Sequence, residues 1–254
     1  MRNLDETFPG PALDEAIWLP AYLPHWSSRA DAAPSYAIRA DGLHLAIPPE
    51  HPLWCPDTHD EPIRISGIQS GHWSGPLGST RGQAPFRPGL VVREDIPPFN
   101  GYTPQYGRIE IRMRGVISPR SMVACWMIGI EDRPERSGEI CLVEIFGASV
   151  RDGSAEVGMG IHAFRDPALR EDWSAERFPL DPAEVHTYAV EWAPGSVDFL
   201  IDGRPVRHAD QAPDYPMQLM IAAFDFPDRA TDTDVSATPE LVVSHVRGRS
   251  PDGA

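Results

Sequence analysis

Proline and glycine occur so often along the chain that long helices are not expected. Of the 254 residues, 28 are Pro and 21 are Gly, and the longest stretch without Pro is 135–166. Proline breaks helix interiors because it lacks a backbone N–H and clashes with the preceding turn. The chain is therefore expected to consist mainly of short extended segments. Its length fits one all-β domain over residues 1–254, with a core large enough to need no disulfide or metal.

Alternation of apolar and charged residues points to strands. In YGRIEIRMRG, residues 106–115, the two Ile and the Met would face a core while the charged residues between them face water. Two successive hairpins are predicted over 186–209, and another is centred on 41–42, where Asp precedes Gly. Further strands are expected at residues 63–68, 122–130, 139–146, 157–164, 217–226 and 241–246.

Ten or more short strands separated by turn residues are typical of an antiparallel β-sandwich or jelly roll. Two stretches, 48–62 and 70–100, are interpreted as long loops, which usually border the binding face of such a fold. One short helix is expected at 182–185.

Charge excludes several classes of function. All 22 basic residues are Arg, so a Walker-type phosphate loop and a Lys Schiff base are excluded. With 37 acidic residues the formal charge is −15, which repels phosphate backbones and anionic lipid. Nucleic acid and membranes are therefore not expected as partners, and neutral ligands remain open.

The cysteines and the N-terminal segment bear on the compartment. Three cysteines, an odd number, leave at least one free thiol, which favours a reducing environment. The first residues contain no apolar export segment, and no run of 18 apolar residues occurs. We expect a soluble, cytoplasmic monomer; secretion is the alternative if the sequence has been trimmed.

The segment SGEICLVEIFG, residues 137–147, places two glutamates among apolar residues. Ionised carboxylates on a central strand cost free energy unless they face a wet groove. On a regular strand, residues five apart point to opposite faces. One extra residue, a β-bulge, would bring Glu139, Cys141 and Glu144 to one face. Two carboxylates converging on a groove are what retaining glycoside hydrolysis requires; two Glu on a solvated edge face are the plain alternative.

Several segments, in order, resemble glycoside hydrolase family 16, the β-glucanase, agarase and carrageenase family. They are LDETFPGPALDEAIW, YGRIEIRMRG, VACWMIGI and HTYAVEWAPGSVDFLIDGRPV, so the likeness extends over nearly the whole chain. The resemblance implies a concanavalin A-like jelly roll with a concave substrate groove. It also implies an endo-acting, retaining hydrolase of a neutral or substituted β-linked polysaccharide or oligosaccharide, with a β-glucan as the expected substrate.

The family's active-site pattern is Glu-x-Asp-x-x-Glu, in the variant with a β-bulge. Carried over, it implies Glu139 as the nucleophile and Glu144 as the general acid/base. Cys141 stands where the family has an Asp that hydrogen-bonds the nucleophile. Because a Cys thiol is mostly neutral and a weak donor at pH 7, turnover is expected to be reduced, shifted in pH or lost.

Two more departures from the family concern substrate and metal. No Trp stands shortly before the first Glu, which weakens a β-1,3-glucan assignment. Ser244 occupies the position where many members have an Asp that helps to hold a structural calcium ion. The segment 51–61 includes zinc-ligand types, but their spacing fits no closed tetrahedral site; they are His51, Cys55, Asp57, His59 and Asp60. We therefore expect no metal and no cofactor, with a structural calcium ion as the alternative.

Aromatic residues are the candidates for sugar binding, since they stack on the apolar C–H faces of sugar rings. Trp126 resembles the family's groove Trp, with core packing as the alternative. His162 matches a position where several members place a His beside the acid/base, or it is structural. Weaker candidates, as able to pack as to bind, are Trp73, Tyr102, Trp173 and Phe224.

Three functions remain open from the sequence. The first is the retaining hydrolase, or a transglycosidase with weakened hydrolysis. The second is a lectin-like module that keeps the groove but has lost the chemistry because of Cys141. The third is a structural sandwich protein with no affinity for saccharides.

Overall fold

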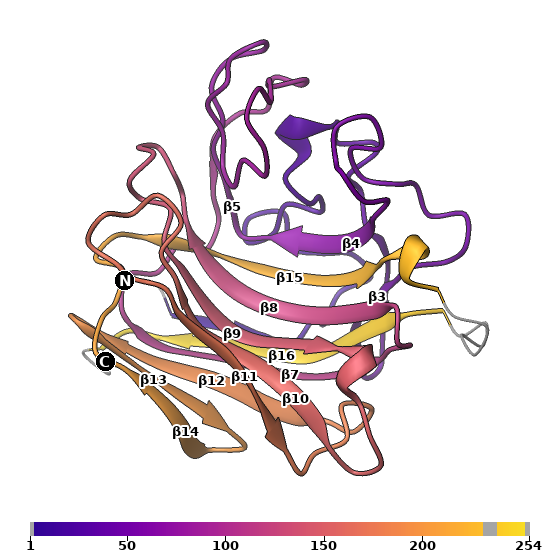
Figure 1. The fold of residues 1–254 in the computed structure, drawn as a ribbon, viewed down its shortest axis with the longest axis vertical. Helices are drawn as coiled ribbons and strands as arrows, with labels where there is room; N and C mark the ends of the chain where they lie inside the picture. The colour runs from indigo at the N-terminus through magenta and orange to yellow at the C-terminus, as the bar shows by residue number, and fades with distance from the viewer. Residues whose placement is uncertain (1–2, 231–237, 252–254) are drawn as a thin grey trace.

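The computed structural model describes residues 3–230 and 238–251, which fold into two stacked antiparallel sheets (Figure 1). One sheet has the order β14-β13-β12-β7-β16-β3-β2, with β1 added to β16. Its strands are β1 (Leu4–Glu6), β2 (Ser35–Arg39), β3 (Gly42–Ala46), β7 (Gly107–Val116), β12 (His186–Ala193), β13 (Ser196–Ile201), β14 (Arg204–Ala209) and β16 (Glu240–Arg249).

The second sheet has six strands in the order β11-β10-β9-β8-β15-β4. Its strands are β4 (Arg64–Gln69), β8 (Ser121–Gly129), β9 (Glu139–Phe146), β10 (Ala155–His162), β11 (Asp172–Phe178) and β15 (Met217–Asp225). A small ribbon of β5 (Gly71–His72) and β6 (Phe99–Asn100) and three 3-10 turns, Pro24–Trp26, Gly147–Ser149 and Pro227–Arg229, complete the assignment. The predicted antiparallel sandwich of jelly-roll type is confirmed.

The strand predictions match the structure closely, and the exceptions have physical reasons. Each predicted strand range holds a strand, and the three predicted hairpins form as β2–β3, β12–β13 and β13–β14. The helix expected at 182–185 is wrong: these residues form a turn before β12. Strand β11 was not expected, because its sequence DWSAERF is largely polar and only partly buried. The part of the chain described contains no helix long and apolar enough to cross a membrane.

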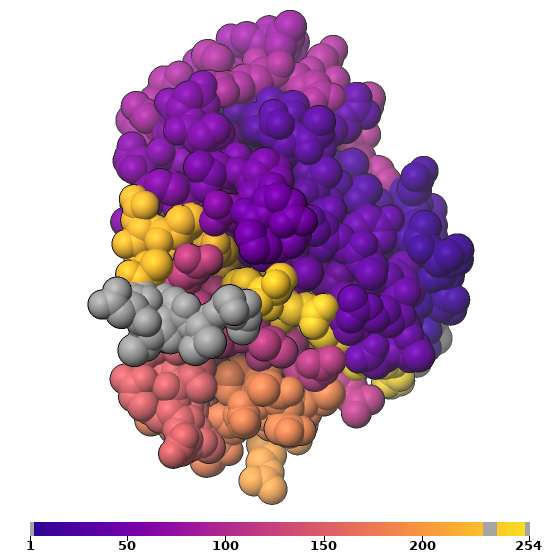
Figure 2. All heavy atoms as spheres, turned by 90° about the vertical axis from the view of Figure 1, so that its right-hand side faces the viewer, coloured from indigo at the N-terminus to yellow at the C-terminus, as the bar shows by residue number. Residues whose placement is uncertain are grey.

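Two separate apolar layers stabilise the fold. The larger one fills the space between the sheets, where the alternate residues Val123, Cys125 and Met127 of β8 lie. The other covers the opposite face of the six-stranded sheet, where Trp126 packs edge-on against Tyr22 of the N-terminal segment. In the space-filling view, the indigo and violet first part of the chain and the magenta loop after it make up the upper half of the molecule (Figure 2). One face of the six-stranded sheet is therefore walled by early segments.

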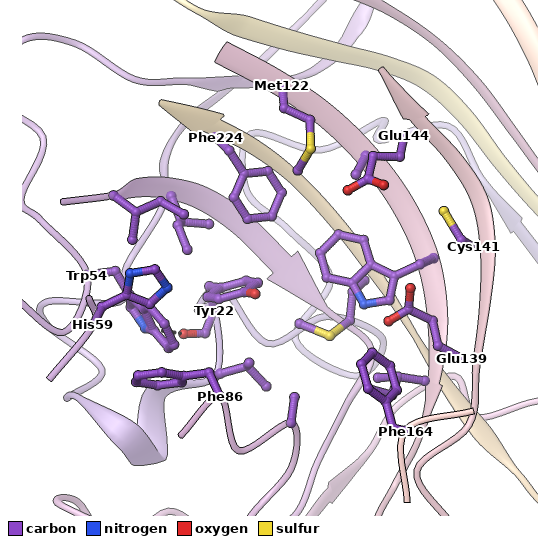
Figure 3. Close-up of a pocket in the computed structure, with 18 of the residues that line it drawn as sticks. Tyr22, Trp54, His59, Phe86, Met122, Glu139, Cys141, Glu144, Phe164 and Phe224 are labelled. Atoms are coloured by element: carbon purple, nitrogen blue, oxygen red, sulfur yellow. Dashed lines mark hydrogen bonds between the residues drawn. The ribbon is translucent and has the colours of Figure 1, made fainter. Parts of the chain in front are cut away.

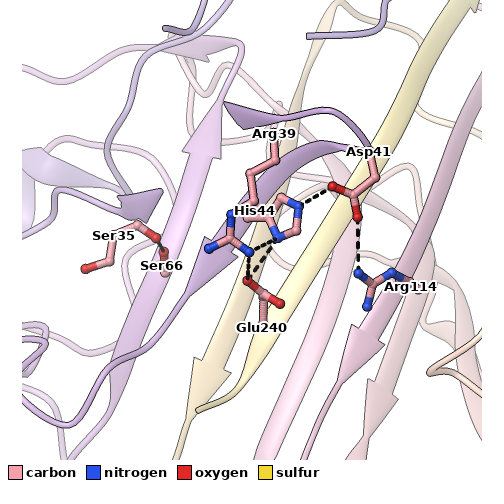
Figure 4. A network of polar contacts seen from close by, with 7 residues as sticks. All are labelled: Ser35, Arg39, Asp41, His44, Ser66, Arg114 and Glu240. Atoms are coloured by element: carbon pink, nitrogen blue, oxygen red, sulfur yellow. Dashed lines mark hydrogen bonds and ion pairs between the residues drawn. The ribbon is translucent and has the colours of Figure 1, made fainter. Parts of the chain in front are cut away.

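A polar network fastens the β2–β3 hairpin to the last strand (Figure 4). His44, 3 % exposed, contacts Asp41 through Nε2 at 2.8 Å and Glu240 through Nδ1 at 2.9 Å. Arg39 lies 3.6 Å from Glu240, and Arg114 of β7 lies 3.3 Å from Asp41. His44 is the buried member of this cluster, and its two ring nitrogens both have partners, so its burial leaves no polar atom unsatisfied.

Candidate active site

A bulge in β9 decides where its glutamates point. Cys125 of β8 pairs with Val143, but the next residue, Trp126, pairs with Cys141, so Leu142 is an extra residue. Strand β10 has the same irregularity on the other side of β9. The bulge that the sequence predicted is confirmed.

The bulge places both Leu142 and Val143 in the core between the sheets. As a result, Glu139, Cys141 and Glu144 all lie on the opposite face and line one pocket. Gly160 of β10, opposite Cys141, adopts a φ of +140°, and a Cβ there would lie 2.1 Å from the Asp172 carbonyl oxygen. Glycine is thus required where β10 follows the bulge.

The pocket has a volume of about 640 Å³ and lies on the outer face of the six-stranded sheet (Figure 3). Side chains from β8, β9 and β15 form its floor, and segments from both predicted loops and the N-terminus form its walls. Its aromatic lining is Tyr22, Trp54, His59, Phe86, Trp126, Phe146, Phe164, Phe224 and Phe226. A mostly apolar cavity with a few convergent polar groups is the usual form of a ligand site.

Burial raises the pKa of both glutamates. The pKa of Glu139 lies well above its ordinary value, first because of burial and then because of the charges of Glu144 and Glu171. Burial raises the pKa of Glu144 to about 7. Near neutral pH the pair of glutamates therefore retains a proton.

Cys141 lies between the two carboxyls in sequence and is 3 % exposed. Burial raises the pKa of its thiol well above the ordinary value, and the charges of Glu139 and Glu144 raise it further, although the indole of Trp173 acts in the opposite direction. The thiol donates weakly to the Gly158 carbonyl, with Sγ 3.7 Å from the oxygen. It is therefore neutral and gives no hydrogen bond to Glu139.

His162 lies beside Glu139, which differs from the position beside the acid/base that the resemblance implied. The two residues are paired across β9 and β10, and His162 Nε2 lies 3.9 Å from Glu139 Oε1. Its Nδ1 lies 2.5 Å from a carboxylate oxygen of Glu171. The register explains the difference, because Gly158, not His162, is the residue opposite Glu144.

Of the aromatic candidates, Trp126 and Phe224 line the pocket, 8 % and 6 % exposed. Trp173 is a neighbour of the site: its indole stacks on His162 with 5.6 Å between ring centroids and lies where a Cβ of Gly158 would be.

Tyr102 and Trp73, like Trp173, are not among the residues that line the pocket. Tyr102 belongs to the core between the sheets, where its ring lies against Gly248 of β16. Trp73 is half-buried in its loop, with the Arg81 guanidinium 4.9 Å above its ring. The Tyr102 ring is therefore buried and contributes to the packing between the two sheets.

Sequence reasoning missed the aromatic wall, defined as Tyr22, Trp54, His59 and Phe86. The Tyr22 ring packs over Gly67 of β4, 3.5 Å from the position that a Cβ of this glycine would take. It packs edge-on against Trp54, with 5.2 Å between ring centroids. Figure 3 shows the Tyr22 hydroxyl directed across the pocket toward the glutamates. The sequence feature that could have revealed this wall is the number of aromatic residues in segments that lack the alternation typical of strands.

Metal ligands do not converge anywhere in residues 3–230 and 238–251: no three His, Cys, Asp or Glu side chains are grouped to hold an ion. The Ser244 hydroxyl donates to the Arg112 carbonyl at 3.2 Å. All three cysteines are free and buried.

The β-sandwich, with two carboxyls on a bulged strand facing an aromatic pocket, has the form of a glycan-processing enzyme. The model of the glycosyl hydrolases family 16 matches residues 102–238, more than half of the sequence. The chain belongs to this family. Among curated proteins, none matches it by sequence.

Solved structures give the same fold. A GlcNAcα1-4Gal releasing endo-β-galactosidase from Clostridium perfringens is 25 % identical, with a TM-score of 0.81; the match covers 99 % of this chain and 63 % of that one. A laminarinase from Flavobacterium sp. UMI-01 is 16 % identical over 97 % of this chain and 99 % of its own, with a TM-score of 0.64. A β-glucanase of Bacillus licheniformis is 14 % identical over 98 % of each chain, with a TM-score of 0.58. The chain thus spans less than two thirds of the galactosidase structure, and the two glucanases show the fold alone.

Proposed function

We propose that the chain is a retaining, endo-acting glycoside hydrolase of a β-linked glycan. The observation that carries this proposal is the β9 bulge, which turns Glu139 and Glu144 onto one face and into one pocket. Glu139 attacks the anomeric carbon and forms a covalent glycosyl-enzyme while Glu144 protonates the leaving oxygen. Glu144 then removes a proton from the water that hydrolyses this intermediate.

This division of work requires the shared proton to sit on Glu144 when the sugar is attacked. Burial and the charge of Glu144 oppose this, because both favour the protonated form of Glu139. Since Cys141 gives no hydrogen bond to Glu139, His162 is the group placed to stabilise its anion, with Nε2 3.9 Å away. His162 would then take over the polar contact to the nucleophile that the resemblance assigns to the family's Asp.

The pocket favours a neutral glycan. Its two arginines, Arg165 and Arg229, are already paired with Glu131 and Glu61. With the two glutamates also present, no uncompensated positive charge among the described lining residues is available for sulfate or uronate. The similarity at 25 % identity supports a β-galactoside as the first substrate class. A β-glucan, expected from the sequence, is the second.

Release of reducing ends from neutral β-galactans and β-glucans tests the function. Glu139→Gln and Glu144→Gln should each remove nearly all activity of the native chain, because neither amide can attack or transfer a proton. Glu184→Gln, the same change at an exposed turn residue, is the control and should leave activity unchanged. Azide added to the smaller variants Glu139→Gly and Glu144→Gly would distinguish the two roles, because rescue of a nucleophile variant gives a glycosyl azide of inverted configuration and rescue of an acid/base variant gives one of retained configuration. Full activity in either Gln variant would refute the assignment.

A saccharide-binding protein without hydrolysis is the second candidate, favoured by the buried, neutral Cys141. It predicts binding of oligosaccharide by the native chain without cleavage at any pH. Cys141→Asp separates the two: a large rise in rate identifies a weakened hydrolase, and an unchanged absence of cleavage identifies the binding protein.

A further inference from the structure

Phe164 is an exposed aromatic residue at the rim of the pocket. It follows the end of β10, lines the same pocket as Glu139 and is 61 % exposed. Figure 3 shows its ring near Glu139, across the pocket from Phe86. The ring contacts His162, with 5.5 Å between ring centroids, but most of its surface remains exposed toward the pocket.

The backbone at Phe164 is also strained. Its φ is +45°, in the left-handed region that bulky residues rarely adopt. Such strain persists where the surrounding structure enforces it, and it gathers at ligand-binding sites. Strain and exposure therefore coincide on one residue at the pocket mouth.

Hydrogen bonds on both sides of Phe164 enforce this conformation. Before it, the Ala163 N–H donates to Glu171 at 3.3 Å. After it, the Arg165 N–H donates to the Ser137 hydroxyl at 2.9 Å. The loop thus has little freedom to relax, although the ring between its anchors is exposed.

A buried carboxylate ties this loop to the opposite wall. Glu131, whose side chain is 1 % exposed, pairs with the Arg165 guanidinium through one oxygen. Its other oxygen accepts the Ala84 N–H at 2.6 Å. Because Ala84 lies two residues before Phe86, one group fixes the rim residues on both sides of the pocket.

From this geometry we propose that Phe164 is a sugar-binding platform, on which the C–H face of the sugar unit next to Glu139 stacks. The inference rests on the proposed function for the identity of the ligand. Offset stacking on an aromatic face needs no charge and suits a neutral glycan. The anchored loop holds the ring ready, so that binding does not have to order it.

Kinetics and gel retardation on the neutral β-galactans and β-glucans test the platform. Phe164→Ala should raise KM about tenfold with a smaller change in kcat, whereas Phe164→Trp should stay within about threefold of the native chain. Val185→Ala, which truncates an exposed apolar residue in a turn outside the pocket, is the control and should change neither constant.

A thermal measurement separates binding from folding. Phe164→Gly should lose the same affinity as Phe164→Ala but unfold about 2–4 °C higher than it, because glycine adopts a positive φ without strain. A lower melting temperature for the Gly variant would overturn the strain argument.

The outcomes distinguish the two proposals. If the native chain cleaves glycan and Phe164→Ala matches it in KM, the platform is refuted and the hydrolase stands. If the native chain is retarded without cleavage and Phe164→Ala is not retarded, the platform stands and the hydrolase fails. If no glycan is cleaved and none retards the native chain, both the platform and the hydrolase are refuted.

Discussion

Glu144→Gln should make the protein more stable while it removes activity, and the gain should depend on pH. In the folded chain burial raises the pKa of Glu144 from 4.5 to about 7, whereas the unfolded chain keeps the lower value. Above the folded pKa, the native pocket holds an anion that water would solvate better. A rise of this size corresponds to about 3 kcal/mol of lost stability in the native protein.

The sign follows from proton binding. Between pH 4.5 and about 7 the folded chain binds more protons at Glu144 than the unfolded chain, so the native free energy of unfolding falls as the pH rises. Gln cannot ionise and avoids this loss. The variant should therefore exceed the native chain by about 2–3 kcal/mol near pH 8, and the difference should largely vanish near pH 4.

Urea unfolding at the two pH values measures the effect, since the slope of the transition checks that the unfolded states match. Glu184→Gln, the same substitution at an exposed turn, is the matched control and should show no such pH-dependent gain. A Glu144→Gln variant whose advantage is the same near pH 4 and near pH 8, or that is less stable at the higher pH, would refute the account of this carboxyl.

Two further results are expected. The value of kcat/KM should fall about tenfold for each pH unit below about 7, because protonation of both Glu139 and Glu144 removes the attacking anion. A kcat/KM that begins to fall only below pH 5 would contradict the raised pKa values. Gly160→Ala should lower the free energy of unfolding in urea by about 2 kcal/mol or more and lower activity, because its Cβ would lie 2.1 Å from a backbone oxygen. Gly153→Ala, also at positive φ but in open space, should lower the free energy of unfolding less. Equal losses in the two variants would argue against the clash.

The sequence predicts the sandwich and the bulge for the same reason. Each depends on local alternation of apolar and polar residues, and in β9 the pattern fails at one place, where Leu142 and Val143 follow each other. A two-residue apolar step between polar positions requires an extra residue if both are to reach the core. A bulge that brings Glu139 and Glu144 to one face could therefore be predicted from the sequence, with two Glu on a solvated edge face as the alternative, and the pairing of β8 with β9 decides for the bulge.

The neighbours of the glutamates could not be inferred in this way. The side of the pair on which His162 lies depends on the register between β9 and β10, which the bulge itself shifts. The aromatic wall comes from segments without periodicity, and its placement depends on contacts as distant in sequence as that between Tyr22 and Phe224. Tyr102 and Phe164 are both aromatic and lie close to strand ends, and only the packing around each separates an anchor from an exposed rim residue.

The position of β15 has a consequence for biosynthesis. This strand, residues Met217–Asp225, lies between β8 and β4 in the six-stranded sheet, and β4 has no other strand partner in it. The early segments that wall the pocket therefore have no sheet to rest on until the ribosome has made most of the chain. A nascent polypeptide arrested before Met217 would carry both glutamates and yet have no pocket in which to use them.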